Sequence, residues 1–429
     1  MKSSRQIAAE ALLKVEDGGY SQLCLDSALK NSGLSQQDIS FTSMLFYGVI
    51  ERKLTLDHCL SKYIKKKPTQ KVAIILRCAV FQMLHMDFVP PHAAISEAVE
   101  LTRKMGQTSA AGMVNAVLRS FQRDNMAVMP FKGDRIDKIS IEYSCSKDVA
   151  KAFVEWYGEE KTKEILACSF GRPPLFLRVN TLKISGDELY EKLTADGYKV
   201  FKRHLDGDCF EVEGGVIKSC LHSEGYYHIQ DICSQNAALL LEAKKEERIL
   251  DICAAPGSKS FILAQQMNNT GEILSCDIAS KRLALVRLSA EKLGILNIKT
   301  VENDASAFNA GLGKFDRILC DLPCSGLGVI RRKPEIKYRT ADSWSELPSL
   351  QLKILEAAVN YLKPCGVMVF STCTINPNEN DMVIEKLLKN HPELKPYPFD
   401  GGVWKKTNLP DREGGDGFFV ARIRKNNDA

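Results

Sequence analysis

Two cysteines stand where a thiol can do chemistry. Cys324 lies in Asp321-Leu-Pro-Cys-Ser-Gly326, and Cys373 lies in Ser371-Thr-Cys-Thr374. Each motif follows an apolar run that reads as a strand, and the proline after Leu322 cannot continue a sheet ladder, so the chain leaves the sheet there. A thiolate is a strong nucleophile, which makes both cysteines candidates for covalent catalysis. Taken alone, the first motif makes Cys324 the preferred candidate for the nucleophile.

Acidic residues come at the ends of several expected strands. They are Asp251, Asp277, Asp304 and Asp321. In an open parallel sheet the carboxyl ends of the strands line the ligand crevice, and an acid after the second strand typically binds ribose hydroxyls. Such a series suits a nucleoside ligand without a pyrophosphate, and S-adenosylmethionine meets that description. Each acid taken singly could instead be a helix cap.

A turn of small residues follows Asp251. The turn, 253–257, reads Cys-Ala-Ala-Pro-Gly and runs directly into a helix. Small residues let the backbone approach a ligand, and the helix N-terminus offers unpaired N–H groups. The G-x-G-x-x-G pattern of dinucleotide-binding folds and the Walker pattern are both missing from the turn. The turn therefore disfavours a nicotinamide-dependent oxidoreductase.

The elements that position these residues alternate from Arg248 onward. The expected strands are 248–253, 272–277, 298–302, 315–321, 366–371 and 417–423, with helices such as 283–293 and 350–362 between them. This alternation indicates an α/β fold with a doubly wound parallel sheet in a domain of residues 248–429. Strands of such a sheet share one carboxyl edge, which brings Cys324 and Cys373 together. We expect the last strand to be an antiparallel edge strand.

The rest of the chain has a different character. Residues 1–140 read as an all-helical domain, and they hold 19 Lys and Arg against 13 Asp and Glu. A basic turn, 62–68, adds a tyrosine among lysines, so this domain could hold RNA, or it could be a helper that only packs on the catalytic domain. Residues 141–247 read as a small α+β domain, with strands at 175–181 and 209–216 and a helix at 187–196.

The composition of the chain argues against several classes of protein. The chain has 429 residues, is 45% hydrophobic and carries a net charge of +5. No apolar run approaches the ~18 residues of a membrane span, so we expect a cytoplasmic protein without membrane contact. Its 14 cysteines include no C-x-x-C pair, which argues against a zinc site and a disulfide framework. We expect no bound metal.

Three motifs together resemble the RNA cytosine-C5 methyltransferases, specifically the Sun or RsmB branch. They are 251–257 with Lys259, 321–326 and 371–374. The likeness covers the whole chain: 331–335 resembles the basic segment after the family's fourth motif, 178–181 an upstream motif, 416–420 the last strand, and the helical front a NusB-type RNA-binding domain. The family usually has glycine at Ser258, threonine at Ser260, alanine at Leu322 and aspartate at Glu335. Because serine tolerates a positive φ less readily than glycine, Ser258 must have an ordinary backbone conformation.

The resemblance implies methyl transfer from S-adenosylmethionine to C5 of a specific cytosine in 16S ribosomal RNA, through a covalent bond between cysteine and C6. It assigns the nucleophile to Cys373, product release to Cys324 and base orientation to Asp321, which reverses the first choice between the thiols. The residues it implies for the cofactor are Cys253, Ala254, Ala255, Pro256, Gly257, Ser258, Lys259, Asp277, Arg282, Asp304 and Asp321. Those expected to contact RNA are Arg178, Asn180, Arg331, Arg332 and Lys333.

The expected partner is 16S ribosomal RNA, free or in an early assembly particle, and we expect a monomer. Two other functions remain open. The first is an RNA-binding assembly factor that holds S-adenosylmethionine without catalysis. The presence of both cysteines and of Asp321 argues against it. A DNA cytosine methyltransferase would use Cys324 as nucleophile, and Cys373 with the basic helical front favours RNA over it.

Overall fold

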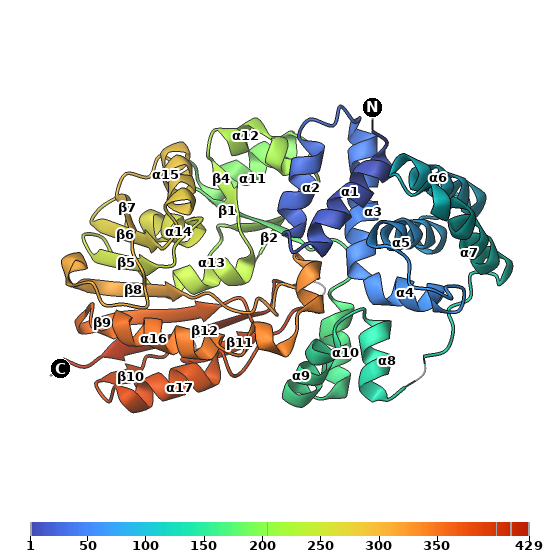
Figure 1. Cartoon of the computed structure of the whole chain (residues 1–429). Helices are drawn as coiled ribbons and strands as arrows, with labels where there is room; N and C mark the ends of the chain where they lie inside the picture. Colours follow the sequence, from blue (N-terminus) through green and yellow to red (C-terminus); the bar gives the residue numbers. More distant parts are fainter. Residues whose placement is uncertain (1, 132, 204, 400, 412–413, 428–429) are drawn as a thin grey trace. The chain divides into compact units, whose positions relative to one another are not determined.

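Residues 2–131, 133–203, 205–399, 401–411 and 414–427 are described by a computed structural model, in which the chain divides into two units. Unit 1 comprises residues 1–172 and 330–341, and unit 2 comprises 173–329 and 342–429. Figure 1 colours the elements along the chain. The chain passes between the units after Arg172, after Val329 and after Ala341.

Unit 1 is helical wherever it is described, as the apolar spacing predicts. Proline shapes its middle, because α5 ends at His85 and α6 begins at Pro91. Helix α8 crosses the predicted boundary at residue 140, helices α9 and α10 lie beyond it, and all three group with this unit. The helices are α1 (Ser4–Glu16), α2 (Ser21–Leu29), α3 (Gln36–Glu51), α4 (Lys53–Ser61), α5 (Gln70–His85), α6 (Pro91–Lys104), α7 (Ala111–Arg123), α8 (Arg135–Glu142), α9 (Lys147–Tyr157) and α10 (Glu159–Ala167).

Unit 2 begins with a small antiparallel sheet of order β2-β3-β1-β4. Its strands are β1 (Leu175–Val179), β2 (Lys199–Lys202), β3 (Cys209–Glu213) and β4 (Tyr227–Ile229), with α11 (Gly186–Ala195) and α12 (Cys220–Ser223). The predicted mixture of strands and a helix in this region is confirmed. Helix α13 (Ile232–Leu239) then leads to the large sheet, and Asp231 caps it by accepting from Cys233 N.

The large sheet has eight strands in the order β10-β12-β9-β8-β5-β6-β7, with β11 paired to β12. Strands β5 to β9 pair in parallel, which confirms the doubly wound pattern. The last strand, β12, runs antiparallel to β9 as expected. Its expected edge position is wrong, because β10 and β11 also pair with β12. The strands are β5 (Arg248–Ile252), β6 (Glu272–Asp277), β7 (Ile298–Glu302), β8 (Phe315–Asp321), β9 (Leu362–Thr372), β10 (Leu394–Pro396), β11 (Lys405–Asn408) and β12 (Phe418–Lys425).

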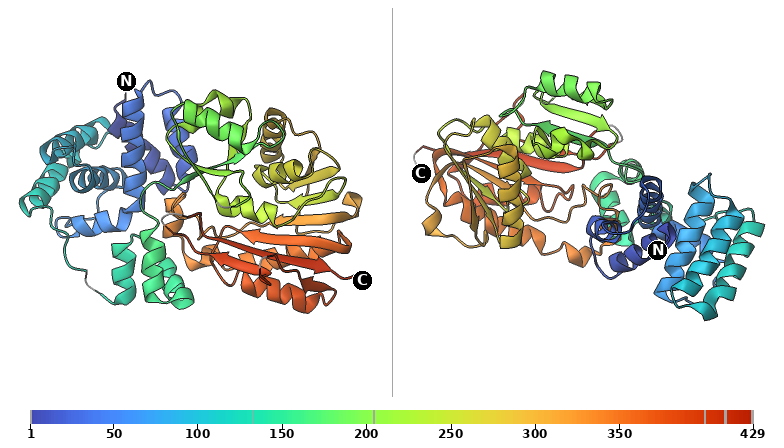
Figure 2. Two further views of the ribbon diagram at one scale, coloured as in Figure 1. Left: turned by 180° about the vertical axis from the view of Figure 1, so that it is seen from behind. Right: turned by 90° about the horizontal axis from the view of Figure 1, so that it is seen from above.

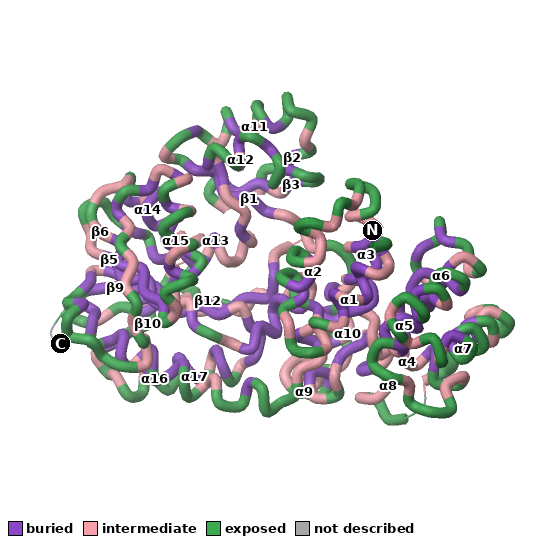
Figure 3. The backbone as a smooth tube through the Cα atoms, turned by 45° about the horizontal axis from the view of Figure 1, so that its top comes forward, coloured by how far each residue is buried: buried purple, intermediate pink, exposed green. Residues whose placement is uncertain are grey.

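Alternate residues of each central strand face opposite helix layers. Leu250, Ile318 and Phe370 pack with α16 (Leu347–Val359) and α17 (Asp381–Asn390). Residues one position away, such as Leu319 and Val369, pack with α13, α14 (Ser258–Gln266) and α15 (Ser280–Leu293). Figures 1 and 2 show these helices on the two faces of the sheet, and Figure 3 shows the central strands largely buried. The carboxyl ends of β5, β6, β8 and β9 therefore meet at one edge.

Candidate active site

The turn after β5 is built by backbone geometry. Cys253 adopts a left-handed φ of 61°, and Gly257 has a φ of 103°. A Cβ at Gly257 would come within 2.7 Å of Phe261 Cζ, so only glycine fits between β5 and α14. Ser258 is the first residue of α14, so it has the ordinary conformation that the sequence requires of it. The turn thus brings backbone groups, rather than bulky side chains, to the end of the strand.

Asp277, the last residue of β6, braces this turn. Its carboxylate accepts from Ala255 N at 3.3 Å and from Ala279 N at 3.0 Å. Arg282, from α15, lies 3.2 Å from Asp277 Oδ2 and also donates to Ala255 O. The structure therefore joins three of the residues predicted to hold the cofactor, although their binding role stays a prediction.

Asp321 is held in place from two elements. Lys259 Nζ, from α14, donates to its Oδ2 at 2.7 Å, and Ser371 Oγ, from β9, donates to its Oδ1 at 2.8 Å. The Asp321 side chain is 30% exposed, whereas that of Lys259 is 10% exposed. The carboxylate is thus oriented yet open to a ligand at the edge of the sheet.

The predicted meeting of the two thiols is present. Cys324 Sγ lies 3.3 Å from Cys373 Sγ. Cys324 follows β8 and Cys373 follows β9, and these strands are parallel neighbours, so their ends bring the two loops together. Both cysteines are partly exposed. A ligand at this edge can reach either sulfur.

The environment sets the protonation of Cys324. Its contact with Cys373, together with burial and the nearby charge of Glu379, raises the pKa of the Cys324 thiol well above its ordinary value. The Cys324 thiol therefore keeps its proton at neutral pH.

A buried carboxylate that the sequence analysis did not select holds the thiol loops together. Glu379, fully buried, accepts from Ser325 N at 2.8 Å and also from Ser325 Oγ. Asn376 Nδ2 donates to it at 2.9 Å, and Gln351 Nε2 at 3.1 Å. In the sequence, Asn-Pro-Asn-Glu (376–379) reads as a helix start, and an acid two residues before the helix gives no sign of this network. Glu379 ties the loop of Cys324 to the loop of Cys373.

Close backbone contacts tighten the same loops. Gly328 N donates to Cys373 O at 3.1 Å, and Gly417 N donates to Gly328 O at 2.9 Å. A Cβ at Gly328 would lie only 2.0 Å from Gly417 O, so this crossing requires glycine. The loop from Cys324 to Gly328 is therefore held by the loop that follows β9 and by the segment before β12.

Asp251 lies beneath the turn. It is fully buried, and Ser260 Oγ donates to its Oδ2 while also contacting Ser275 Oγ at 2.8 Å. Its Oδ1 has no hydrogen-bond partner among the described residues. Burial is the main cause that raises the pKa of the Asp251 carboxyl to about 7.

Other predicted site residues lie in different surroundings. Asp304 is exposed, and its Oδ1 accepts from Ser306 N and Oγ, which lowers the pKa of this carboxyl. Arg178 is buried with its guanidinium 2.6 Å from Asp206 Oδ2. Asn180 is buried and donates to Gly225 O and Leu293 O, each at 2.8 Å. These contacts brace unit 2, and any binding of RNA or cofactor by the three residues stays a prediction.

The basic segment falls in the other unit. Arg331, Arg332 and Lys333 belong to unit 1, where Arg331 Nη2 donates to Arg172 O at 2.6 Å. Their contact with RNA stays a prediction. Within the described residues, we find no cluster of His, Cys, Asp and Glu suited to a metal ion and no helix with the length and apolarity to cross a bilayer.

Family models match most of the chain. The model of the 16S rRNA methyltransferase RsmB/F matches residues 238–424, the NusB family model matches 2–123, and the ferredoxin-like domain of the RsmF/B-like methyltransferases matches 149–216. The first span covers the large sheet of unit 2, the second covers α1 to α7 of unit 1, and the third includes α10 of unit 1 together with strands β1 to β3 of the small antiparallel sheet.

Similar proteins cover the whole chain. The probable ribosomal RNA small subunit methyltransferase B of Bacillus subtilis is 36% identical over 444 residues, with 99% of each chain covered. The solved structure of PH0851 covers 99% of both chains with a TM-score of 0.85 at 24% identity, which shows a shared fold. A methyltransferase homolog protein from Pyrococcus horikoshii is 29% identical, with a TM-score of 0.62 over 68% of this chain and 100% of that one.

Proposed function

Because this chain belongs to the RsmB/F family of 16S rRNA methyltransferases, we propose that it methylates C5 of one cytosine in 16S ribosomal RNA through a covalent bond between Cys373 and C6 of the base. The methyl donor in this proposal is S-adenosylmethionine. The observation that carries it is the pair of thiols 3.3 Å apart at neighbouring strand ends, beside the oriented carboxylate of Asp321. A target base has to be unstacked before a thiol can reach C6.

The turn after β5 suits S-adenosylmethionine. Its backbone can approach a ligand because Gly257 leaves no room for a side chain, and α14 begins directly after it. Asp277 and Arg282 hold the turn from β6 and α15. When bound there, S-adenosylmethionine supplies an electrophilic methyl group. Lys259 and Asp321 stand between this turn and the thiols, at the place where the donor and the base would meet.

Cys373 acts first in the proposed reaction. Cytosine C5 is a poor nucleophile until a thiolate adds to C6, which opens the double bond between C5 and C6 and moves its electron pair toward C5, so that C5 can attack a methyl group. In this proposal Cys373 reacts as the thiolate, while Cys324, whose thiol pKa is raised by its contact with Cys373, keeps its proton. Asp321 hydrogen-bonds the base near N3 and N4 and orients C6 toward Cys373 Sγ.

Cys324 acts in the second half of the proposed reaction, after the methyl group has been transferred. When the methyl group joins C5, its bond to the sulfonium sulfur of the donor breaks and S-adenosylhomocysteine is left. The contact with Cys373 is the main cause of the raised pKa of Cys324. Once Cys373 is bonded to carbon its sulfur carries no charge, so the Cys324 thiol ionises more readily and passes its proton to solvent. The Cys324 thiolate then takes the C5 proton, the electron pair re-forms the double bond between C5 and C6, and the bond from C6 to Cys373 Sγ breaks to give back a thiolate.

The test separates the two thiols. Each variant is incubated with S-adenosylmethionine and 16S ribosomal RNA carrying tritium at cytosine C5. Cys373→Ala should show neither tritium release nor adduct, whereas Cys324→Ala should accumulate a denaturation-resistant adduct between protein and RNA. Cys220→Ala, which removes an exposed thiol outside the site, is the matched control and should behave as the unaltered protein. An adduct formed by Cys373→Ala would overturn the assignment, and no methyl transfer by the unaltered protein would favour an assembly factor.

A further inference from the structure

The two thiols of the candidate site are close enough to be joined to one another. Cys324 Sγ and Cys373 Sγ lie 3.3 Å apart, whereas the two sulfurs of a disulfide lie about 2.05 Å apart. Rotation of the two side chains can close the remaining gap of roughly 1.3 Å, and no strand has to move. The pair is therefore placed for a second reaction besides the addition of a thiolate to the base.

The backbone around the pair keeps the two sulfurs near each other. Gly328 N donates to Cys373 O at 3.1 Å, so the loop that carries Cys324 is bonded to the residue that carries the second thiol. The hydroxyl groups of Ser325 and Thr374, which directly follow the two cysteines, lie 2.7 Å apart. All of these residues belong to unit 2. Because each thiol stays within reach of the other, a bond between them forms in an intramolecular step.

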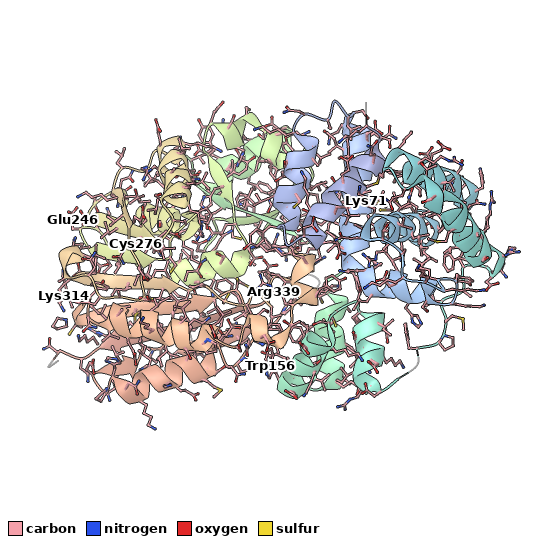
Figure 4. All side chains as sticks on the ribbon, viewed as in Figure 1. Lys71, Trp156, Glu246, Cys276, Lys314 and Arg339 are labelled. Carbon is pink, nitrogen blue, oxygen red and sulfur yellow. The ribbon has the colours of Figure 1, made fainter. Side chains whose placement is uncertain are left out.

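Access to an oxidant separates the pair from other cysteines of the large sheet. Cys276 on β6 and Cys320 on β8 are buried, and Figure 4 labels Cys276 within the sheet. Cys324 and Cys373 are partly exposed, so a small oxidant can reach their sulfurs. Cys253 is also partly exposed, but burial raises the pKa of its thiol to about 12, which leaves it poorly reactive.

We propose that Cys324 and Cys373 form a redox-modification site, at which hydrogen peroxide oxidises the pair to a disulfide that stops methyl transfer until a dithiol reduces it. The proposal rests on the function proposed above, in which Cys373 is the nucleophile. It adds to that function a means by which an oxidant regulates the same site.

The first step takes place at Cys373. Its thiolate attacks one oxygen of hydrogen peroxide, the bond between the two oxygens breaks, and hydroxide leaves. The hydroxide takes up the proton that the thiol released when it ionised, which gives the first water. Cys373 is then a sulfenic acid.

Cys324 reacts in the second step. Its sulfur attacks Cys373 Sγ, the bond from Cys373 Sγ to oxygen breaks, and the departing hydroxide takes the thiol proton of Cys324 as the second water. Contact with Cys373 is the main cause of the raised pKa of Cys324, and a neutral sulfenic acid removes that cause. Two thiols and one peroxide thus give one disulfide and two waters, with the sulfurs oxidised and the peroxide reduced. A dithiol reverses the change by thiol–disulfide exchange and is itself oxidised to a disulfide.

The disulfide leaves no thiol for either half of methyl transfer. Cys373 can no longer add to C6 as a thiolate, and Cys324 can no longer take the C5 proton. The turn 253–257 and Asp277, which brace the predicted cofactor site, are not part of the bond. S-adenosylmethionine should therefore bind the oxidised protein as tightly as the reduced protein.

The test treats the full chain with hydrogen peroxide in the absence of RNA. The unaltered protein should lose about 2 Da in intact mass and at least about nine-tenths of its methyl transfer. Peptide mapping after alkylation should yield one pair of peptides joined through Cys324 and Cys373. Dithiothreitol should restore both the mass and the methyl transfer, and calorimetry should give an unchanged affinity for S-adenosylmethionine.

Two variants sharpen this test. Cys324→Ala removes the second thiol, so Cys373 should pass on to a sulfinic acid, about 32 Da heavier, which dithiothreitol does not reverse. Cys365→Ala removes an exposed thiol from β9, the strand that leads to Cys373, and it is the matched control. This variant should form the disulfide as the unaltered protein does.

The possible results separate this proposal from the function on which it rests. Oxidation at Cys253 or Cys365 while the pair stays reduced would overturn it, and so would a disulfide that leaves methyl transfer intact. If the disulfide forms reversibly and stops methyl transfer, yet Cys373→Ala still forms an adduct with RNA, the redox site stands. In that case the assignment of the nucleophile to Cys373 is the part that fails.

Discussion

The carboxyl of Asp251 makes the free energy of unfolding depend on pH, and a single substitution tests this dependence. The pKa of its carboxyl is raised to about 7 in the folded chain, against about 3.9 for an unperturbed aspartate. Because the pKa of the Asp251 carboxyl is higher in the folded chain than in the unfolded chain, its contribution to the free energy of unfolding is fully present below the pKa of the unfolded chain. This contribution is lost as the pH rises through the pKa of the folded chain. The loss therefore falls between about pH 4 and pH 7.

Asp251→Asn should remove this loss, because an amide can still accept from Ser260 Oγ but does not ionise. We expect the free energy of unfolding of the unaltered protein to fall, relative to the variant, by roughly 4 kcal/mol between pH 4 and pH 8. Urea denaturation of both proteins at four pH values measures the difference. Parallel curves would show that Asp251 is charged throughout.

The variant Gly257→Ala tests whether the turn after β5 requires glycine. Gly257→Ala introduces a Cβ within 2.7 Å of Phe261 at a φ of 103°. We expect it to destabilise the protein by about 1–3 kcal/mol and to weaken binding of S-adenosylmethionine, measured by calorimetry. Gly112→Ala in α7, where a Cβ meets nothing within 4 Å, should instead be neutral or stabilise by up to about 1 kcal/mol. Equal effects of the two variants would contradict this role of the turn.

The loops that carry the thiols depend on Glu379 as an acceptor. Glu379→Gln turns one acceptor into a donor facing other donors, so Ser325 N–H or the amide of Gln351 loses its partner. We expect a loss of about 2–4 kcal/mol in the free energy of unfolding and a lower kcat. Glu385→Gln on α17, which removes an exposed carboxylate paired with Lys405, is the control and should change stability by less than about 1 kcal/mol. Normal turnover by Glu379→Gln would show that the loops hold their positions without it.

The sequence predicted the strands and the acids at their ends because those signals are local. Apolar runs have a period, and Asp277 and Asp321 each follow one directly. The meeting of Cys324 and Cys373 followed from the shared edge of parallel strands. Glu379 could not be found in this way, because its partners come from three separate segments. The inner position of β12 was missed because the short strands β10 and β11 leave little periodic signal.

Binding of RNA by the helical unit is best tested on its surface. Lys65, Lys66 and Lys67 are exposed in the connection between α4 and α5. Changing all three to glutamate should weaken binding of 16S ribosomal RNA at least tenfold and make the dependence of affinity on salt shallower by about 2 units of slope. Lys386→Glu with Lys389→Glu on α17 is the control, since these lysines are exposed in unit 2. An unchanged affinity and salt slope would favour the reading of this unit as a packing element.

Removing residues 1–140 would be a less clear experiment. Tyr338 packs against the core of α1 to α7, so the deletion would also expose residues 330–341. This packing could not be predicted from the sequence, in which Lys337 looks like one more cation in a basic segment. Burial of a lysine depends on acceptors such as Glu51 O and Tyr143 O, which lie far away in the chain.

The return of residues 330–341 to the helical unit also sets an order of synthesis. Residues 1–172 leave the ribosome first, yet their unit lacks the segment 330–341 until residue 341 has been made. At about 5–20 residues per second, the wait after Arg172 is roughly 10–30 s. During that time the carbonyls of Glu51 and Tyr143, at the ends of α3 and α8, lack their hydrogen bond from Lys337, and water must donate to them instead. The helical unit is thus completed by a segment that is translated after the turn that follows β5, and both units should mature together.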